Sequence, residues 1–124
     1  MLMLTPRANL SQLIGLPDDF PIKRRFRDRY ELRSYVRLAL LAEKLMNHPE
    51  LISRGSAYLE RFTKNDPRQL RTYQVWTDLL RLPVPELVSA LLADDERGAW
   101  MRETSPVFVV IPPQAIREVA DLAA

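Results

Sequence analysis

The chain has no cysteine, a single histidine and only three glycines among its 124 residues. Without cysteine it forms no disulfide, no zinc site with thiolate ligands and no cysteine nucleophile. Because the three glycines are isolated, they make no glycine-rich phosphate loop. The beginning of the sequence also lacks the basic start and long apolar run of a secretory signal, so we expect a cytoplasmic protein.

Residues of the kind that carry catalysis are equally sparse. His48 has no partner histidine, and its position before a proline is typical of a helix junction. The acidic residues are scattered singly except for Asp18-Asp19 and Asp94-Asp95-Glu96, which are typical of a loop and of a helix start. No serine lies in a nucleophile elbow. We therefore predict no enzymatic activity, no cofactor and no metal site.

The remaining composition is that of an ordinary globular domain. Hydrophobic residues make up 47% and charged residues 27%, a balance that supports one packed core. The longest apolar run, Leu38 to Ala42, is far too short to cross a bilayer, so no membrane association is expected. We predict a single helical domain over residues 1–124.

Proline positions and apolar spacing predict helices along most of the chain. Thr5-Pro6 and Asp66-Pro67 each place a capping residue before a first-turn proline, and Gly15 supplies a stop. The expected helices cover residues 6–14, about 31–47, 49–65 and 67–81, a short helix around 87–92, a piece carrying Trp100 and Met101, and 114–122. The predicted class is all-α, a compact bundle of about five to seven short and medium helices.

Two segments fall outside this helical pattern. Leu16 to Pro21 carries two prolines and two aspartates, which predicts a loop and a hinge. The alternative interpretation of residues 1–30 is a mobile N-terminal arm. Val107 to Ile111 has β character but ends at Pro112-Pro113 and has no second strand to pair with. We expect it to be an extended buried segment near the C-terminus.

Positive charge is concentrated near the start of the chain. Through Arg37 there are eight cationic and four acidic side chains, although the net charge of the whole chain is only +2. Arginine and lysine interleaved with aromatic residues can grip phosphates or an acidic protein partner. The alternative is a solvated helix start with two core aromatics. The candidate residues for partner or nucleic-acid binding are Lys23, Arg24, Arg25, Phe26, Arg27, Arg29, Tyr30, Arg33 and Arg37.

A second candidate lies after the turn at Asn65-Asp66-Pro67. The helix that follows opens with polar side chains of types that can reach base edges in DNA. Helical hairpins joined by short capped turns are common in any bundle, and they are the structural alternative. The residues of this alternative DNA-reading helix are Arg68, Gln69, Arg71, Thr72 and Gln74.

Several stretches resemble a known group of proteins. They are Arg33-Ser34 opening a helix that ends Ala42-Glu43-Lys44-Leu45, the segment Tyr73 through Trp76 to Leu79-Leu80, and the run Arg102 to Pro106. In these the chain resembles, over roughly residues 33–117, small helical bacterial proteins identified as antitoxin components of toxin–antitoxin loci. The resemblance implies a helical protein that neutralises a toxin encoded beside it, and it carries over no catalytic residues.

These observations favour a non-catalytic protein that acts by binding. The leading expectation is an antitoxin-like regulator that neutralises a partner protein, with homo-oligomerisation left open. One alternative is a DNA-binding transcriptional regulator that uses residues 23–37 or the helix after Pro67. Another is a small structural subunit of a larger complex, which the many apolar side chains support although no motif indicates it.

Overall fold

The computed structural model describes residues 3–124, so the first two residues of the alternative mobile arm lie outside it. Over these residues the chain is all-α, which confirms the predicted class. Two short 3-10 turns, Pro49–Leu51 and Pro67–Gln69, precede α3 and α4. The α-helices are α1 Leu10–Ile14, α2 Arg29–Asn47, α3 Ile52–Phe62, α4 Leu70–Leu79, α5 Val84–Leu92, α6 Glu96–Thr104 and α7 Pro113–Ala123.

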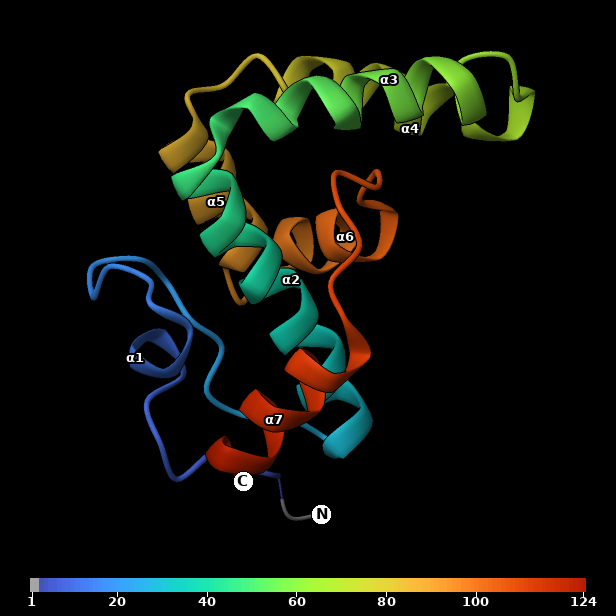
Figure 1. Cartoon of the computed structure of the whole chain (residues 1–124). Coiled ribbons are helices and arrows are strands. Elements are labelled where there is room, and N and C mark those ends of the chain that lie inside the picture. The colour runs from blue at the N-terminus through green and yellow to red at the C-terminus, as the bar shows by residue number, and fades with distance from the viewer. Residues whose placement is uncertain (1–2) are drawn as a thin grey trace.

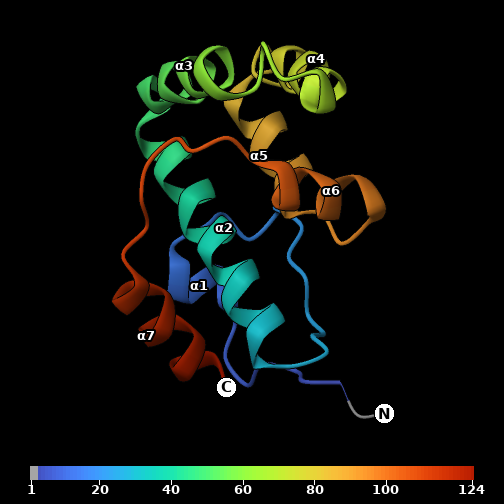
Figure 2. The ribbon, with the colours of Figure 1, turned by 90° about the vertical axis from the view of Figure 1, so that its right-hand side faces the viewer.

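Helix α2 is the centre of the fold. It packs against α5 and α7, while α6 packs on α5 and α1 packs on α7 (Figures 1 and 2). A helix with neighbours on several sides needs apolar residues around most of its circumference. Accordingly its buried residues are not confined to one stripe; they are Leu32, Tyr35, Val36, Leu38, Ala39, Leu41, Ala42 and Leu45. None of the helices in the described part of the chain has the length and apolar character needed to cross a bilayer.

Aspartate side chains fix the starts of α2 and α6 and of the turn before α4. The Asp28 carboxylate accepts the backbone N–H of Glu31 at 2.9 Å, and Asp95 accepts that of Gly98 at 2.7 Å. Asp66 accepts the N–H of Arg68 at 3.0 Å, ahead of α4. Each carboxylate satisfies an amide that has no partner inside the helix, and such a cap typically contributes about 1 kcal/mol.

The first helix is shorter than the sequence predicts. It begins at Leu10, capped by Asn9, instead of at Pro6. Upstream the backbone is used in tertiary contacts: Leu4 pairs with Phe26 in an isolated antiparallel bridge, and the Arg7 N–H donates to the carbonyl oxygen of Ala123 at 2.7 Å. These long-range bonds override the local signal at Thr5-Pro6. The predicted stop is confirmed, because Gly15 has a left-handed φ of 91°.

The segment between α6 and α7 is irregular and partly buried, as predicted. Phe108 and Ile111 point into the core, whereas Val107 and Val110 are exposed. The Phe108 ring meets the edge of Trp76 with 6.4 Å between ring centroids, and it lies directly against Gly55 of α3. No side chain larger than hydrogen fits at residue 55 without displacing that ring.

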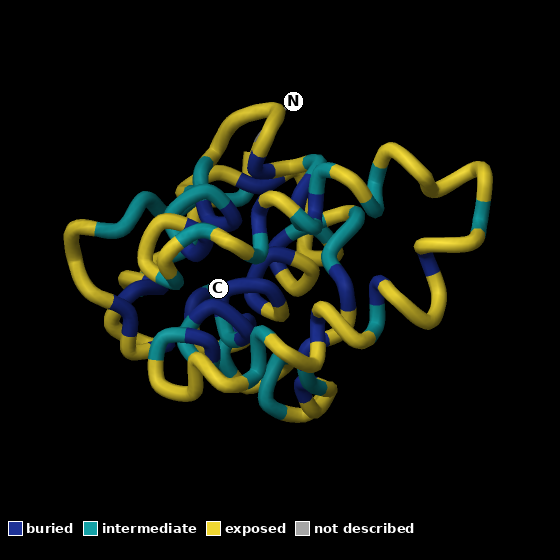
Figure 3. The backbone as a smooth tube through the Cα atoms, turned by 90° about the horizontal axis from the view of Figure 1, so that it is seen from above, coloured by how far each residue is buried: buried dark blue, intermediate teal, exposed yellow. Residues whose placement is uncertain are grey.

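Helices α3 and α4 form an antiparallel hairpin whose turn projects from the rest of the molecule (Figure 1). Seen from above, the projecting part is largely exposed (Figure 3). Within the hairpin, Leu59 of α3, Thr63 just after its end, and Trp76 and Leu79 of α4 are buried. The hairpin is therefore anchored at its inner end by Trp76 and Phe108, and its outer end is free of neighbouring helices.

Candidate partner-binding surface

The basic segment runs without regular secondary structure from residue 23 into the start of α2. Phe26 exchanges two backbone hydrogen bonds with Leu4, at 2.6 and 2.8 Å, and its ring is fully buried. That ring lies edge-on to Tyr35, with 5.5 Å between centroids. Of the two aromatics in the segment, Phe26 thus belongs to the core, as the structural alternative had it.

The Tyr30 ring, in contrast to that of Phe26, is exposed to solvent. It lies in the first turn of α2 and is 78% exposed, the most exposed of the large hydrophobic side chains in residues 3–124. Ser34 and Arg37 follow it at four and seven residues, so the three share one face of the helix. A tyrosine in such a position offers a rigid, amphipathic ring to a partner.

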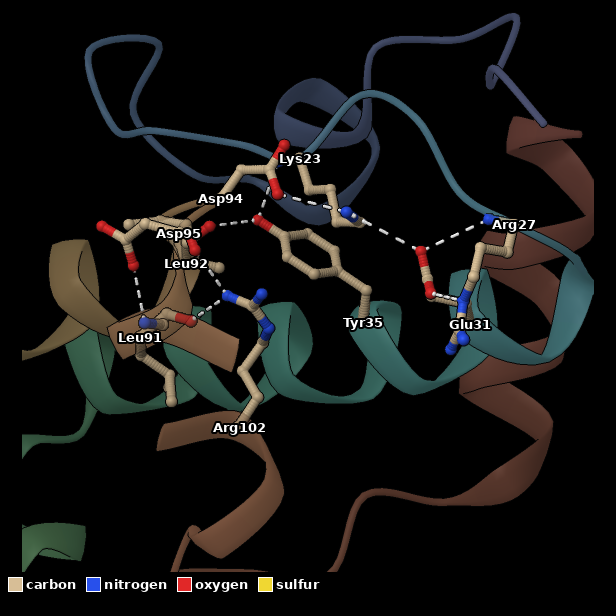
Figure 4. Close-up of polar contacts among 11 residues, drawn as sticks. Lys23, Arg27, Glu31, Tyr35, Leu91, Leu92, Asp94, Asp95 and Arg102 are labelled. Atoms are coloured by element: carbon tan, nitrogen blue, oxygen red, sulfur yellow. Dashed lines mark hydrogen bonds and ion pairs between the residues drawn. The ribbon is translucent and has the colours of Figure 1, made fainter. Parts of the chain in front are cut away.

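Two of the cations hold the segment in place. The Lys23 ammonium lies 3.1 Å from an Asp94 carboxylate oxygen and 3.7 Å from one of Glu31. The Arg27 Nε lies 2.6 Å from the other Glu31 oxygen, and this hydrogen bond raises the pKa of Arg27. Lys23 and Arg27 are therefore engaged within the fold (Figure 4).

The other cations of the segment are exposed, and within residues 3–124 none of them forms an ion pair. Arg29 and Arg33 lie on the side of α2 that borders α7, where they line a small depression with Asp121. Arg37 lies on the Tyr30 side. The full set is Arg24, Arg25, Arg29, Arg33 and Arg37.

A groove of about 590 Å³ opens beside Tyr30, between α2 and the turn that joins α5 to α6. Its wall on the α6 side carries acidic groups and its wall on the α2 side carries Arg37, so both signs of charge face it. A groove of mixed charge suits a polar protein segment better than a purely anionic chain. It is lined by Lys23, Arg27, Tyr30, Glu31, Ser34, Tyr35, Arg37, Leu38, Asp94, Asp95, Ala99, Arg102 and Glu103.

The floor of this groove is rigid. The Tyr35 hydroxyl donates to the carbonyl oxygen of Leu92 at 2.6 Å and accepts the backbone N–H of Lys23 at 2.9 Å. The Arg102 guanidinium donates to the carbonyl oxygens of Leu91 and Ala93, both at 2.8 Å, and stacks 5.0 Å from the centre of the Tyr35 ring (Figure 4). These contacts satisfy the carbonyl end of α5 and fix the α5–α6 turn.

Burial raises the pKa of Tyr35 to about 12. Its hydroxyl is occupied by two hydrogen bonds and keeps its proton to a higher pH than an exposed tyrosine, so it serves as a structural group. Arg102 was not among the predicted site residues. Its role depends on carbonyls nine and eleven residues earlier in the chain, which a sequence pattern does not reveal.

The second predicted set lies on the projecting hairpin. Arg68 and Gln69 are exposed in the 3-10 turn before α4, Arg71 and Gln74 are exposed in the first half of α4, and Thr72 is half-buried. Helix α4 runs back along α3 as an antiparallel hairpin (Figure 1), and the DNA-reading role of its first residues stays a prediction. The two predicted sets occupy different parts of the molecule, α2 and the outer hairpin.

The remaining titratable groups are dispersed. Within residues 3–124, no three His, Asp or Glu side chains come close enough together to hold a metal ion. His48 is exposed at the end of α2 and lies 3.3 Å from Glu50. Of the acidic triplet, Asp94 pairs with Lys23 and Asp95 caps α6.

No protein-family model, curated protein or solved structure matches the chain. The resemblance to antitoxin components accordingly stays a prediction from the sequence.

Proposed function

We propose that the chain is a non-catalytic binding protein, an antitoxin-like regulator that neutralises a partner protein through the surface around Tyr30. The observation that carries this proposal is the exposure of the Tyr30 ring at 78%, on the same face of α2 as Arg37, which forms no ion pair with any residue from 3 to 124. Tyrosine and arginine are the residue types that contribute most at protein interfaces, and they do so when a partner covers them.

The surroundings of Tyr30 support a preformed interface. The adjacent groove has a floor fixed by Tyr35 and Arg102, so the surface loses little conformational entropy on binding. Lys23 and Arg27 are already neutralised by Glu31 and Asp94, which leaves Arg37 to attract an acidic group on the partner. The partner surface that fits is polar, with an acidic group opposite Arg37 and an apolar spot against Tyr30.

A second candidate is a DNA-binding regulator, which the five exposed arginines of the basic segment favour. Phosphate contacts from such a set would release counterions, so affinity would fall steeply as salt is added. An interface centred on a tyrosine responds much less to salt. Salt dependence therefore separates the two functions.

The test is affinity purification of the tagged full chain from cells of its own organism at moderate and high salt. Three proteins are compared: the natural chain, the variant Tyr30→Ala with Arg37→Glu, and the control Arg81→Glu, which replaces an exposed arginine in the turn after α4. We expect one stoichiometric protein that is retained at high salt by the natural chain and the control, lost by the double variant, and toxic when expressed alone.

Three outcomes would overturn the proposal. Recovery of discrete DNA that disappears at high salt, with no stoichiometric protein, would establish the regulator instead. Recovery of a large, constant assembly whose members are not toxic would indicate a structural subunit. Equal recovery of the partner by all three proteins would remove the Tyr30 surface from the interaction.

A further inference from the structure

The outer end of the α3–α4 hairpin carries an apolar stripe that is only partly covered. Gly55, Leu59 and Phe62 follow one another at spacings of four and three, so they share one face of α3. At the inner end of this stripe the Phe108 ring covers Gly55, and Leu59 is buried. At the outer end Phe62 is 54% exposed. The rest of the fold covers the first two turns of the stripe, and the last turn, which carries Phe62, is exposed to solvent.

Phe62 is nevertheless held in a defined position. Its ring packs against that of Tyr58, one turn earlier, with 4.9 Å between centroids. The Arg61 guanidinium lies 5.1 Å from the ring centre. Leu70, 49% exposed, stands at the start of α4 and thus at the same end of the hairpin. An exposed aromatic that is already ordered has the low entropic cost expected of an interface anchor.

The charge around this end is strongly one-sided. Residues 58–71 include four cationic side chains, Arg61, Lys64, Arg68 and Arg71, and only two acidic ones. Both acids are engaged within the hairpin. Glu60 pairs with Lys64 at 3.1 Å and accepts the Tyr73 hydroxyl at 2.7 Å, while Asp66 caps the turn before α4. Within residues 3–124, Arg61, Arg68 and Arg71 form no ion pair, so the apolar end is bordered by three arginines whose charges are not neutralised by a contact.

We propose that the outer end of the α3–α4 hairpin docks into an acidic protein, which receives the Phe62 ring in an apolar pocket and faces Arg68 and Arg71 with carboxylates. This inference rests on the proposed function in taking the partner to be a protein, and it adds a contact surface separate from Tyr30. A second copy of the chain fits poorly, because two such ends would bring like charges together. Nucleic acid would use the arginines but has no pocket for Leu70 and Phe62.

The experiment places the photoreactive amino acid benzoylphenylalanine at position 62 of the full chain, in cells of the source organism. A matched chain carries it at Leu122 of α7, which is 68% exposed. Irradiation is expected to give one protein adduct from position 62 and none of the same mass from position 122. Mass spectrometry identifies the adduct, which is expected to be a protein of net negative charge.

The identified protein is then purified and titrated with variants. Phe62→Ala is expected to weaken its binding roughly 10- to 100-fold, the range of an interface anchor. Arg68→Glu with Arg71→Glu is expected to weaken it at least about 10-fold, because two attractions become repulsions. Since all three side chains are exposed, the variants keep the fold, which thermal unfolding of each variant checks.

Other results would overturn this docking surface. They are an adduct of twice the mass of the chain, an adduct destroyed by nuclease, the absence of any adduct at position 62, or titrations unaffected by either variant. Failure here is distinguishable from failure of the proposed function. A partner that is lost with Tyr30→Ala yet indifferent to Phe62→Ala leaves the Tyr30 surface standing alone, and the reverse pattern leaves only the hairpin.

Discussion

The phenolic oxygen of Tyr35 lies 2.6 Å from the carbonyl oxygen of Leu92 and donates a hydrogen bond to it, although 57 residues separate them in the chain. The same oxygen accepts the backbone N–H of Lys23 at 2.9 Å. One buried hydroxyl thus joins the segment before α2 to the end of α5, two parts of the chain that shape the groove beside Tyr30.

Replacing Tyr35 by phenylalanine should lower the free energy of unfolding by about 1–3 kcal/mol, because a buried carbonyl and a part-buried amide lose their partner. Urea denaturation at pH 7 measures the change. The control is Tyr73→Phe, whose hydroxyl bonds to the exposed Glu60 and whose loss should cost no more than about 0.5 kcal/mol. Equal losses in the two variants would contradict the role assigned to Tyr35.

Stability should also fall with alkaline pH through the same hydroxyl. Burial raises the pKa of Tyr35 from 10 to about 12, so the folded chain keeps this proton at a pH where the unfolded chain has lost it. The contribution is complete below pH 10 and disappears between pH 10 and about 12. Between pH 9 and 11 the natural chain should lose about 1.4 kcal/mol more than Tyr35→Phe. Parallel losses would show that Tyr35 titrates normally.

Glycine at position 55 should be required for full stability, because this residue lies against the Phe108 ring. Alanine in a helix interior is ordinarily about 1 kcal/mol more favourable than glycine. Here the added methyl group would overlap the Phe108 ring, and such overpacking costs about 1–3 kcal/mol, so Gly55→Ala should destabilise the chain.

A double-mutant cycle tests this explanation. In a Phe108→Ala background the overlap is gone, and Gly55→Ala should become neutral or stabilising in guanidinium denaturation. Ser56→Ala, at the next and exposed position of α3, is the control and should have the same small effect in both backgrounds. An unchanged penalty at residue 55 would mean that something other than Phe108 excludes the methyl group.

The hydrogen bond from the Trp76 indole to the Thr104 hydroxyl should contribute to the stability of the fold. Its Nε1–H donates to Thr104 Oγ1 at 2.9 Å, and the tryptophan is fully buried. Thr104→Val keeps the shape but leaves this donor without a partner, at a cost of about 1–3 kcal/mol. Thr104→Ser retains the hydroxyl and should lose clearly less. Chemical denaturation followed by tryptophan fluorescence compares the two, and a serine variant as unstable as the valine variant would contradict the bond.

Helices α2 to α7 could be predicted from the sequence because their signals are local. Asp66-Pro67 and the apolar spacing around Trp76 mark α4 within a few residues. The start of α1 could not, because Thr5-Pro6 carries an equally good local signal. The conformation of the residues before α1 is set by the hydrogen bond from Arg7 to Ala123 and by the pairing of Leu4 with Phe26. Both interactions join residues that are far apart in sequence.

The candidate surface was predictable in composition but not in the roles of its members. The sequence pattern made Phe26 and Tyr30 equally good candidates for binding a partner. In the structure the backbone of Phe26 pairs with Leu4 and its ring is buried, whereas the ring of Tyr30 is exposed. Likewise Lys23 differs from Arg24 only because Asp94, 71 residues away, lies beside it. Arg102 was missed for the same reason.

Helix α7 packs against both α1 and α2, although it follows α2 by most of the length of the chain. The face of α2 that meets α7 is therefore covered by distant residues. Unfolding of α7 alone would expose that apolar face to water, so the stability of α2 depends on α7 staying folded.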